Sequence, residues 1–242
     1  MAGQKRVGRA ETAREKILET AEQLYALHGI DAVSIRQINQ EAGQKNGSAV
    51  HYHFGSREGL IEAIFEHRVG PGNERRLLLL DRLKEASADH LPGLRGIAEA
   101  MVRPLFDGIA AGATSYSRRF FKQVHMQHNL MDKLLSHKHD LGLRECFRLI
   151  RWSHPDVPTP ILYHRYIHAN AIMVDSAANL EERNDLDAAS LNQQRIDLHI
   201  ECCIDSVSGV FEAPISEAAM SLVGDHKKAS DALERMRSRA SI

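Results

Sequence analysis

The 242-residue sequence has few cysteines, few aromatic residues, no excess of either charge and no long apolar run. Its three cysteines, of which Cys202 and Cys203 are adjacent, cannot form the disulfide framework of a small secreted protein. No run approaches the roughly 20 apolar residues that span a bilayer, and the N-terminus lacks the apolar segment of a signal peptide. We therefore expect a soluble cytoplasmic protein with no membrane partner.

The balance of charge limits what the whole chain can indicate about a partner. The 31 Lys+Arg and 32 Asp+Glu give a formal net charge of -1, so any nucleic-acid surface must be local. The 43% of hydrophobic residues are sufficient for a folded core.

Short motifs that carry common enzyme chemistries are also missing. The sequence has no G-x-S-x-G, no phosphate-binding G-x-x-x-x-G-K, no dinucleotide-binding G-x-G-x-x-G and no H-E-x-x-H. We expect a protein that is not an enzyme and needs no cofactor. An enzyme with scattered catalytic residues is kept as an alternative, because it would leave no such signature.

Apolar residues recur at three- and four-residue steps through most of the chain, which is the period of an amphipathic helix. The first predicted helix, over residues 11–28, ends at Gly29. Ser34 and Ser56 are placed to cap two further helices, with a short helix at 48–52 between them. No segment alternates as a strand would, so the predicted fold class is all-α.

A glycine- and proline-containing segment, Val69-Gly70-Pro71-Gly72-Asn73, is the clearest interruption and predicts a domain boundary. Residues 1–69 would form one domain, with a basic N-terminal arm (Lys5, Arg6 and Arg9) that suits phosphate or minor-groove contact. A solvated, disordered terminus is the alternative for this arm. Residues 70–213 would form a larger helical domain, and 214–242 a short helix or flexible tail. The helices predicted after the boundary span residues 73–88, 91–110, 114–128, 131–152, 160–184 and 188–211.

Residues 34–54 combine a helix, a tight turn at Gly43 and a second short helix, which is the arrangement that presents a recognition helix to the major groove. Small and apolar residues would hold the two helices together: Ile35, Ile38, Ala42, Ala49 and Val50. Phe54 is also expected in the core. Hydrogen-bond donors would remain on the outer face: Lys45, Asn46, Ser48, His51 and His53.

The stretch from Gln40 to Leu60 resembles the signature of the TetR family of bacterial transcriptional regulators, and the resemblance covers residues 11–68. Its most specific part is Tyr52-His53-Phe54 followed by Gly55-Ser56-Arg57-Glu58. The resemblance implies a homodimer whose subunits have a three-helix DNA-binding domain and a larger ligand-binding and dimerisation domain. It also implies a repressor on a near-palindromic double-stranded DNA operator, released by a small-molecule effector. An activator of the same fold remains an alternative.

Roles in DNA contact follow from this resemblance. Ser34 is expected to place its hydroxyl and nearby backbone N–H groups against a phosphate, in addition to capping its helix. The residues that match backbone-contacting positions of the family are Tyr52, His53 and Arg57. The candidates for base contacts are Lys45, Asn46, Ser48 and His51. The segment before Phe54 is one residue longer than in the commonest members, so the choice among these candidates stays open.

The effector is expected to be an amphipathic or hydrophobic molecule held in the C-terminal domain. The candidate ligand-binding residues are Met101, Phe106, Phe120, Phe121, His125 and Trp152, which could alternatively fill a core. Arg118 and Arg119 could meet an acidic ligand group, and at least one of them is expected on a solvated helix face.

Histidines and small residues in the later helices suggest two further features. His164 and His168, at i and i+4, could chelate a metal ion, so a metal-responsive regulator is an alternative, although we expect no metal site. The helices at 160–184 and 188–211 are the predicted dimer-forming pair. Their expected contact residues are Ala169, Ala171, Ile172, Val174, Ala177, Ala178, Ile200, Ile204 and Val207.

Overall fold

The computed structural model describes residues 2–87, 90, 92–110, 114–134, 141–187 and 191–223. Across these residues the chain is helical and has no strand, which confirms the all-α prediction. The N-terminal helices are α1 (Ala2–His28), α2 (Ile35–Glu41), α3 (Ala49–Phe54) and α4 (Arg57–Ser87). They are followed by α5 (Leu94–Phe106), α6 (Ser117–His125), α7 (His128–Leu134), α8 (Leu141–Ser153), α9 (Thr159–Leu186), α10 (Gln193–Glu212) and α11 (Glu217–Val223).

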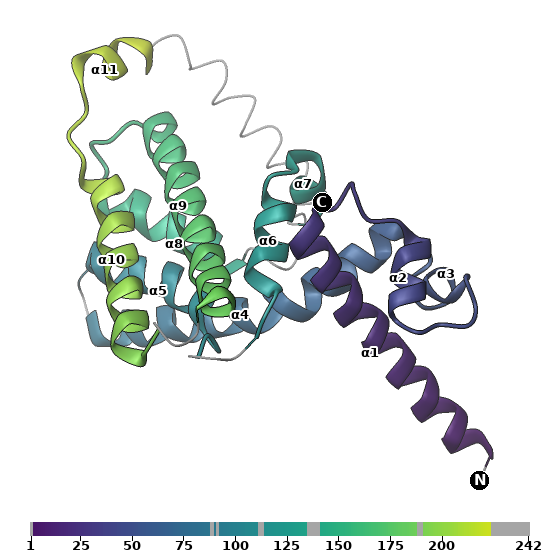
Figure 1. Cartoon of the computed structure of the whole chain (residues 1–242). Coiled ribbons are helices and arrows are strands. Elements are labelled where there is room, and N and C mark those ends of the chain that lie inside the picture. The colour runs from purple at the N-terminus through teal and green to yellow at the C-terminus, as the bar shows by residue number, and fades with distance from the viewer. Residues whose placement is uncertain are drawn as a thin grey trace.

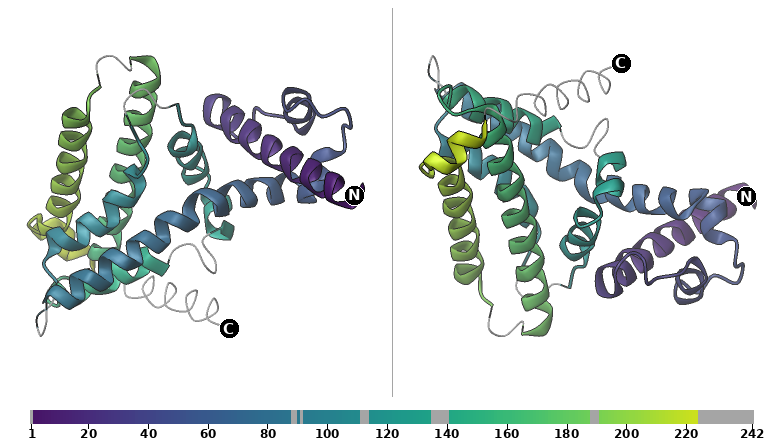
Figure 2. Two further views of the ribbon diagram at one scale, coloured as in Figure 1. Left: turned by 90° about the horizontal axis from the view of Figure 1, so that it is seen from below. Right: turned by 90° about the horizontal axis from the view of Figure 1, so that it is seen from above.

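The helices form two lobes joined by α4 (Figure 1). The smaller lobe holds α1, α2 and α3, and the larger one holds α5, α8, α9 and α10 (Figure 2). α6 and α7 lie between the lobes, and α6 packs against both α1 and α9. Two hydrophobic cores result, and the core of the smaller lobe includes Phe120 and Val124 of α6.

Serine caps start two of the N-terminal helices, as the sequence predicts. The Ser34 hydroxyl accepts a hydrogen bond from the Gln37 backbone N–H at 3.2 Å, which satisfies one of the donors left open at the start of α2. The Ser56 hydroxyl accepts from the Gly59 N–H at 3.0 Å at the start of α4. The turn after α2 uses Gly43 with a φ of 67°, a conformation that costs glycine little.

The predicted interruption at 69–73 is wrong as a helix break, because α4 continues through Pro71 for 31 residues. Asn73 and Arg76, just beyond it, are buried against other helices, so tertiary packing outweighs the cost of the proline. Of the single helix predicted at 131–152, the structure describes α7 and α8 at the two ends, and residues 135–140 between them lie outside the described part. The domain boundary at residue 69 stays a prediction, and residues 224–242 of the predicted tail lie outside the described part.

Most of the residues expected at a dimer interface pack instead into their own subunit. The buried ones are Ala169, Val174, Ala177, Ala178, Ile204 and Val207. They are covered because α9 and α10 pack on each other, with α5 and α6 against the same pair. Ala171 is exposed, and Leu198 is 63% exposed on α10, so these residues lie on the outer face of the pair.

Candidate DNA interface and effector cavity

A buried asparagine fastens α2 to the start of α3. The Asn39 amide nitrogen donates to the Gly47 carbonyl at 2.6 Å, and its oxygen accepts from the Val50 N–H at 3.2 Å. Asn39 is 2% exposed, and its side chain thus has polar partners on both sides of the turn. Our sequence reading missed this residue, although it lies on the apolar face of α2, four residues after Ile35.

The apolar contacts predicted between α2 and α3 are present. Ile38, Ala42, Ala49 and Val50 are buried, and Ile35 packs at the edge of the same core. Phe54 is half-buried against this core, as expected, and the Arg14 guanidinium lies 5.1 Å from the centre of its ring. The helix-turn-helix is therefore a packed unit with a defined outer face.

That outer face carries the polar residues nominated for base contacts. Lys45, Asn46, Ser48 and His51 are all exposed. The Asn46 side-chain oxygen accepts from the Ser48 N–H at 3.0 Å, so this oxygen shapes the entry to α3 and the amide nitrogen is left for a ligand. The His51 Nδ1 lies 3.0 Å from the Gly55 carbonyl, which can only accept. Nδ1 therefore donates, and the Nε2 of a neutral ring is an acceptor.

The residues nominated for contact with the DNA backbone separate into two groups. Tyr52 is 80% exposed, and its ring lies edge-on to that of His53 at 4.9 Å. Arg57 instead turns into the domain, where it donates to the Ile30 carbonyl and lies 5.9 Å from the ring centre of Tyr25. The predicted phosphate contact by Arg57 does not agree with this geometry, because its guanidinium is engaged inside the lobe.

A cavity of about 1250 Å³ opens among α4, α5, α6, α8 and α9. Of the predicted ligand-binding residues, Phe121, His125 and Trp152 line it. Met101, Phe106 and Phe120 do not line it, since they are buried in the two cores. Phe120 and Phe121 differ because adjacent residues of a helix point about 100° apart. Lining residues missed by the sequence reading include Phe65, Arg68, Arg76, Phe147, Tyr163 and Tyr166.

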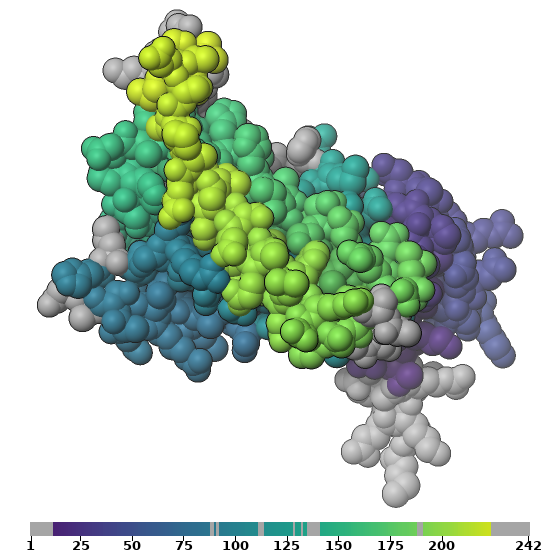
Figure 3. Space-filling model, turned by 60° about the vertical axis from the view of Figure 1, so that its left-hand side comes forward, coloured from purple at the N-terminus to yellow at the C-terminus, as the bar shows by residue number. Residues whose placement is uncertain are grey.

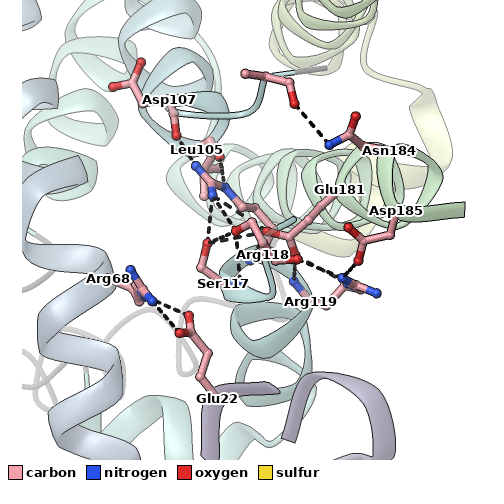
Figure 4. A network of polar contacts seen from close by, with 12 residues as sticks. Glu22, Arg68, Leu105, Asp107, Ser117, Arg118, Arg119, Glu181, Asn184 and Asp185 are labelled. Atoms are coloured by element: carbon pink, nitrogen blue, oxygen red, sulfur yellow. Dashed lines mark hydrogen bonds and ion pairs between the residues drawn. The ribbon is translucent and has the colours of Figure 1, made fainter. Parts of the chain in front are cut away.

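A carboxylate of α9 holds the first turn of α6 beside this cavity (Figure 4). Glu181, 2% exposed, accepts from the backbone N–H groups of Arg118 at 3.2 Å and Arg119 at 3.0 Å. A negative charge is favourable there because these N–H groups have no partner within the helix. The Arg119 side chain pairs with Glu181 and Asp185, and Arg118 with Glu181.

These two arginines correct one prediction. Their side chains are only 16% (Arg118) and 12% (Arg119) exposed, so neither lies on a solvated face. Burial lowers the pKa of Arg118, and the Glu181 carboxylate opposes that shift. The Arg118 guanidinium also donates to the Leu105 carbonyl at 2.9 Å, which ties α6 to the end of α5.

A second ion pair joins the cavity wall to the smaller lobe. Arg68 of α4 lines the cavity and donates to both carboxylate oxygens of Glu22 on α1, at 2.7 and 2.6 Å (Figure 4). Hydrogen bonding to Glu22 raises the pKa of Arg68. Such bidentate pairs hold both partners in a fixed geometry, so α1 and the cavity wall are mechanically connected.

The histidine pair of α9 gains no further ligands. His164 and His168 are both exposed. Over the residues that the structure describes, no group of three or more His, Cys, Asp and Glu is arranged to hold a metal ion. Within the same residues, no helix combines the length and the apolar character that crossing a membrane requires.

Comparison with known proteins shows what the helix-turn-helix and the overall fold are similar to. Residues 17–64 match the family model for bacterial regulatory proteins of the tetR family. No curated protein matches the chain. A tetR family transcription regulator from Shewanella sp. PV-4 is 18% identical over 81% of this chain and 96% of its own, with a TM-score of 0.53, which supports the fold alone.

Two further solved structures overlap more loosely. A tetR-family transcriptional regulator from Mesorhizobium loti is 16% identical over 84% of this chain and 98% of its own, with a TM-score of 0.45. RolR in complex with the ligand resorcinol is 14% identical over 87% of this chain and 98% of its own, with a TM-score of 0.41. The family assignment rests on residues 17–64, which contain the helix-turn-helix. Over these residues the chain is similar to the DNA-binding region of the tetR family of bacterial regulatory proteins.

Proposed function

We propose that the protein is a repressor that binds a near-palindromic operator as a homodimer and leaves it when a small amphipathic effector enters the cavity. The observation that carries this proposal is the position of α6 between the two sites. Its residues Phe120 and Val124 belong to the core of the DNA-binding lobe, whereas Phe121 and His125 line the cavity. An effector that moves Phe121 would therefore shift a helix packed against α1.

α4 provides a second route between the sites. It contributes Leu60 and Ile61 to the DNA-binding core and Phe65 and Arg68 to the cavity wall, and Arg68 holds Glu22 of α1. An effector acts only through its different affinities for the two conformations of the dimer. Reversing operator occupancy almost completely takes a difference of about 5.5 kcal/mol.

The outer face of the helix-turn-helix supplies the proposed DNA contacts. Lys45, Asn46, Ser48 and His51 would meet base edges in the major groove. Ser34, Tyr52 and His53 would contact the DNA backbone and fix the register of the recognition helix. Arg57 is assigned a structural role, because it is engaged with Ile30 and Tyr25.

Dimerisation is assigned to the outer face of α9 and α10. Figure 3 shows α10, in yellow-green, along the surface of the molecule. This face includes Ala171, Leu198 and Cys202, all exposed in the single subunit. Two such helix pairs related by a two-fold axis would bury these residues in a four-helix bundle.

Operator binding by the full-length protein tests the proposal directly. Fluorescence anisotropy at fixed salt would compare the upstream intergenic DNA with random DNA, with and without a lipophilic ligand library. The variant Lys45→Ala/His51→Ala should weaken operator binding at least about tenfold, because each good base contact is worth about 1–3 kcal/mol. Arg82→Ala, which removes one exposed positive charge from the distal part of α4, is the matched control and should bind as the wild type does.

The outcomes separate the possible roles. Specific binding that one ligand class abolishes supports a repressor released by its effector. Specific binding that ligand leaves intact would favour an activator or a constitutive repressor. Binding no tighter than to random DNA at every upstream and genomic fragment would contradict the proposal.

A further inference from the structure

The effector cavity contains a buried positive charge that the protein leaves largely unpaired. Arg76 of α4 lines the cavity and is 5% exposed. Its Nη2 donates to the Met101 carbonyl at 3.2 Å, while its Nε is buried with no hydrogen-bond partner in the described residues. Guanidinium N–H groups that are hidden from water and not hydrogen-bonded cost free energy, so they call for an explanation.

Three other arginines of the cavity wall have carboxylate partners. Arg68 pairs with a buried Glu22, and Arg118 with Glu181. Arg148, nearer the surface, donates to both oxygens of Glu145 at 2.7 Å. Three of the five other arginines that line the cavity are thus neutralised by a carboxylate.

Arg76, which is more deeply buried than Arg148, differs from these three arginines. Across the described ranges no carboxylate forms an ion pair with it. The neighbouring thiol of Cys146 cannot supply a negative charge, because burial raises its pKa to about 12. The charge of Arg76 is therefore compensated by neither an acidic side chain nor a thiolate.

Packing fixes the unpaired guanidinium in place. α8 approaches α4 so closely at Gly142 that a Cβ there would lie 2.9 Å from the Arg76 Cδ. The Gly142 N–H donates to the Asn73 side-chain oxygen at 2.9 Å, which holds the two helices at this separation. The aliphatic part of Arg76 is therefore clamped, and its charged end has little freedom to leave the cavity.

The surroundings of this charge are apolar and aromatic. The Phe147 ring lies 5.1 Å from that of Tyr166 and 6.5 Å from that of Tyr163, and all three line the cavity. Leu143 and Met173 extend the apolar wall. Such a site fits a molecule with one charged end and an apolar or aromatic body.

We propose that the effector is an organic carboxylate whose anionic end pairs with Arg76 and whose apolar body lies against Phe147, Tyr163 and Tyr166. This inference rests on the proposed effector-binding function of the cavity. A carboxylate matches the planar fork of a guanidinium and can accept two hydrogen bonds from it, including one from Nε. The neutral amide of the same molecule lacks the charge and offers only one acceptor atom.

Matched acid and amide pairs test this proposal by isothermal titration calorimetry on the full-length protein. The probes are decanoate with decanamide, 4-pentylbenzoate with 4-pentylbenzamide, and 2-naphthoate with 2-naphthamide. At least one carboxylate should bind the wild type about tenfold or more tightly than its amide. An amide that binds as tightly as its acid in every pair would overturn the proposal, as would no carboxylate binding at about 1 mM.

Two variants locate the preference within the cavity. Arg76→Met keeps most of the aliphatic volume and should reduce the acid-to-amide ratio to about one, whereas Arg76→Lys should retain part of it. Arg148→Met is the matched control, since this arginine also lines the cavity but already has a carboxylate partner, and its ratio should be unchanged. A preference that survives in Arg76→Met contradicts the proposal.

Thermal unfolding distinguishes a receptor for ligand from a structural arginine. Without ligand, Arg76→Met should unfold at a temperature no lower than the wild type, because it removes an unpaired buried charge. A structural role predicts a clear decrease, and such a decrease with no change in ligand preference counts against the inference. Operator binding measured on the same samples separates the two proposals. Release by neutral ligands alone contradicts only the carboxylate inference, while absence of operator binding contradicts the repressor.

Discussion

Asn39 in the helix-turn-helix and Arg76 in the cavity are both buried polar residues, and they differ in how far their hydrogen-bonding groups are used. Asn39 donates to Gly47 and accepts from Val50, and so joins two helices. Arg76 has a buried Nε with no partner in the described part of the chain and no neutralising carboxylate. A satisfied polar group in a core fixes one structure, whereas an unsatisfied one is available to a ligand.

Substitution of Asn39, whose side chain has hydrogen-bond partners on both sides, should have the largest effect. Asn39→Ala leaves the Val50 N–H and the Gly47 carbonyl without their side-chain partners, and each buried unsatisfied group costs about 1–3 kcal/mol. We expect the free energy of unfolding to fall by about 2–4 kcal/mol and operator affinity to fall with it. Urea denaturation followed by circular dichroism measures the first effect.

Asn46→Ala is the control for this substitution. Asn46 is exposed, and its loss should change stability by less than about 1 kcal/mol while still weakening operator binding. Equal losses of stability for the two asparagines would mean that Asn39 does not have the organising role assigned to it. Arg76→Met should cost no stability. Comparing it with Asn39→Ala and Asn46→Ala tests whether the loss of a hydrogen-bonded buried group costs more stability than the loss of a buried group without partners.

Backbone packing of the smaller lobe is tested at Gly59, in the first turn of α4. A Cβ at this position would lie 2.2 Å from the Phe54 carbonyl oxygen, and that atom belongs to the backbone and cannot turn aside. Gly59→Ala should therefore destabilise the protein by about 1–3 kcal/mol, as overpacking does.

Gly70→Ala, in the same helix, should change stability much less. Apart from its chain neighbours and its own helix, nothing lies within 4 Å of a Cβ there. The preference of alanine for a helix, about 0.5–1 kcal/mol over glycine, is opposed by the following Pro71, which disfavours the helical conformation of a residue that has a Cβ. Thermal unfolding of the two variants side by side measures both effects. If Gly70→Ala destabilised the protein as much as Gly59→Ala, local crowding would not be the cause.

The same contrast shows which parts of the molecule the sequence could predict. Local signals were sufficient for the smaller lobe: the serine caps at Ser34 and Ser56, the turn at Gly43 and the apolar face of α2 were all predicted correctly. Asn39 was missed because a polar residue does not contribute to the apolar pattern by which the buried face of α2 was recognised. The continuation of α4 through Pro71 was missed because packing, which is not local, overrides the proline.

The cavity depends on contacts between distant segments, so it could be predicted only in part. Phe121, His125 and Trp152 were identified by residue type, and Met101, Phe106 and Phe120 were chosen by the same criterion but face the cores. The helical periodicity of apolar residues does not by itself show which of two adjacent phenylalanines faces a cavity. Arg76 could not be identified at all, because its isolation depends on which carboxylates lie near the other arginines.

A further small effect concerns Glu145, the carboxylate that neutralises Arg148 and Lys84 at the edge of the cavity. Hydrogen bonds from Arg148, together with Lys84, lower the pKa of Glu145 to about 2 from its ordinary value of 4.5. A carboxyl group whose pKa is lower in the folded state stabilises the protein above its unfolded pKa, and this stability is lost as pH falls through the folded value. Glu145→Gln should therefore lower the free energy of unfolding at pH 7. We expect about 1 kcal/mol, since Arg148 and Lys84 are about 40% exposed, with side-chain exposures of 43% and 38%.

The pH dependence of that difference makes the prediction specific. The stability gap between the wild type and Glu145→Gln should be constant from pH 7 down to about pH 5 and then narrow between pH 4.5 and about pH 2. Urea denaturation at pH 7, 5 and 4 would follow the start of this decrease, with Glu85→Gln as the control at an exposed carboxyl of α4. A gap that stayed constant to pH 4 and below would mean that Glu145 stabilises the protein by packing rather than by its charge. The contrast between Arg148, as an arginine neutralised by a carboxylate, and the unpaired Arg76 would then not hold.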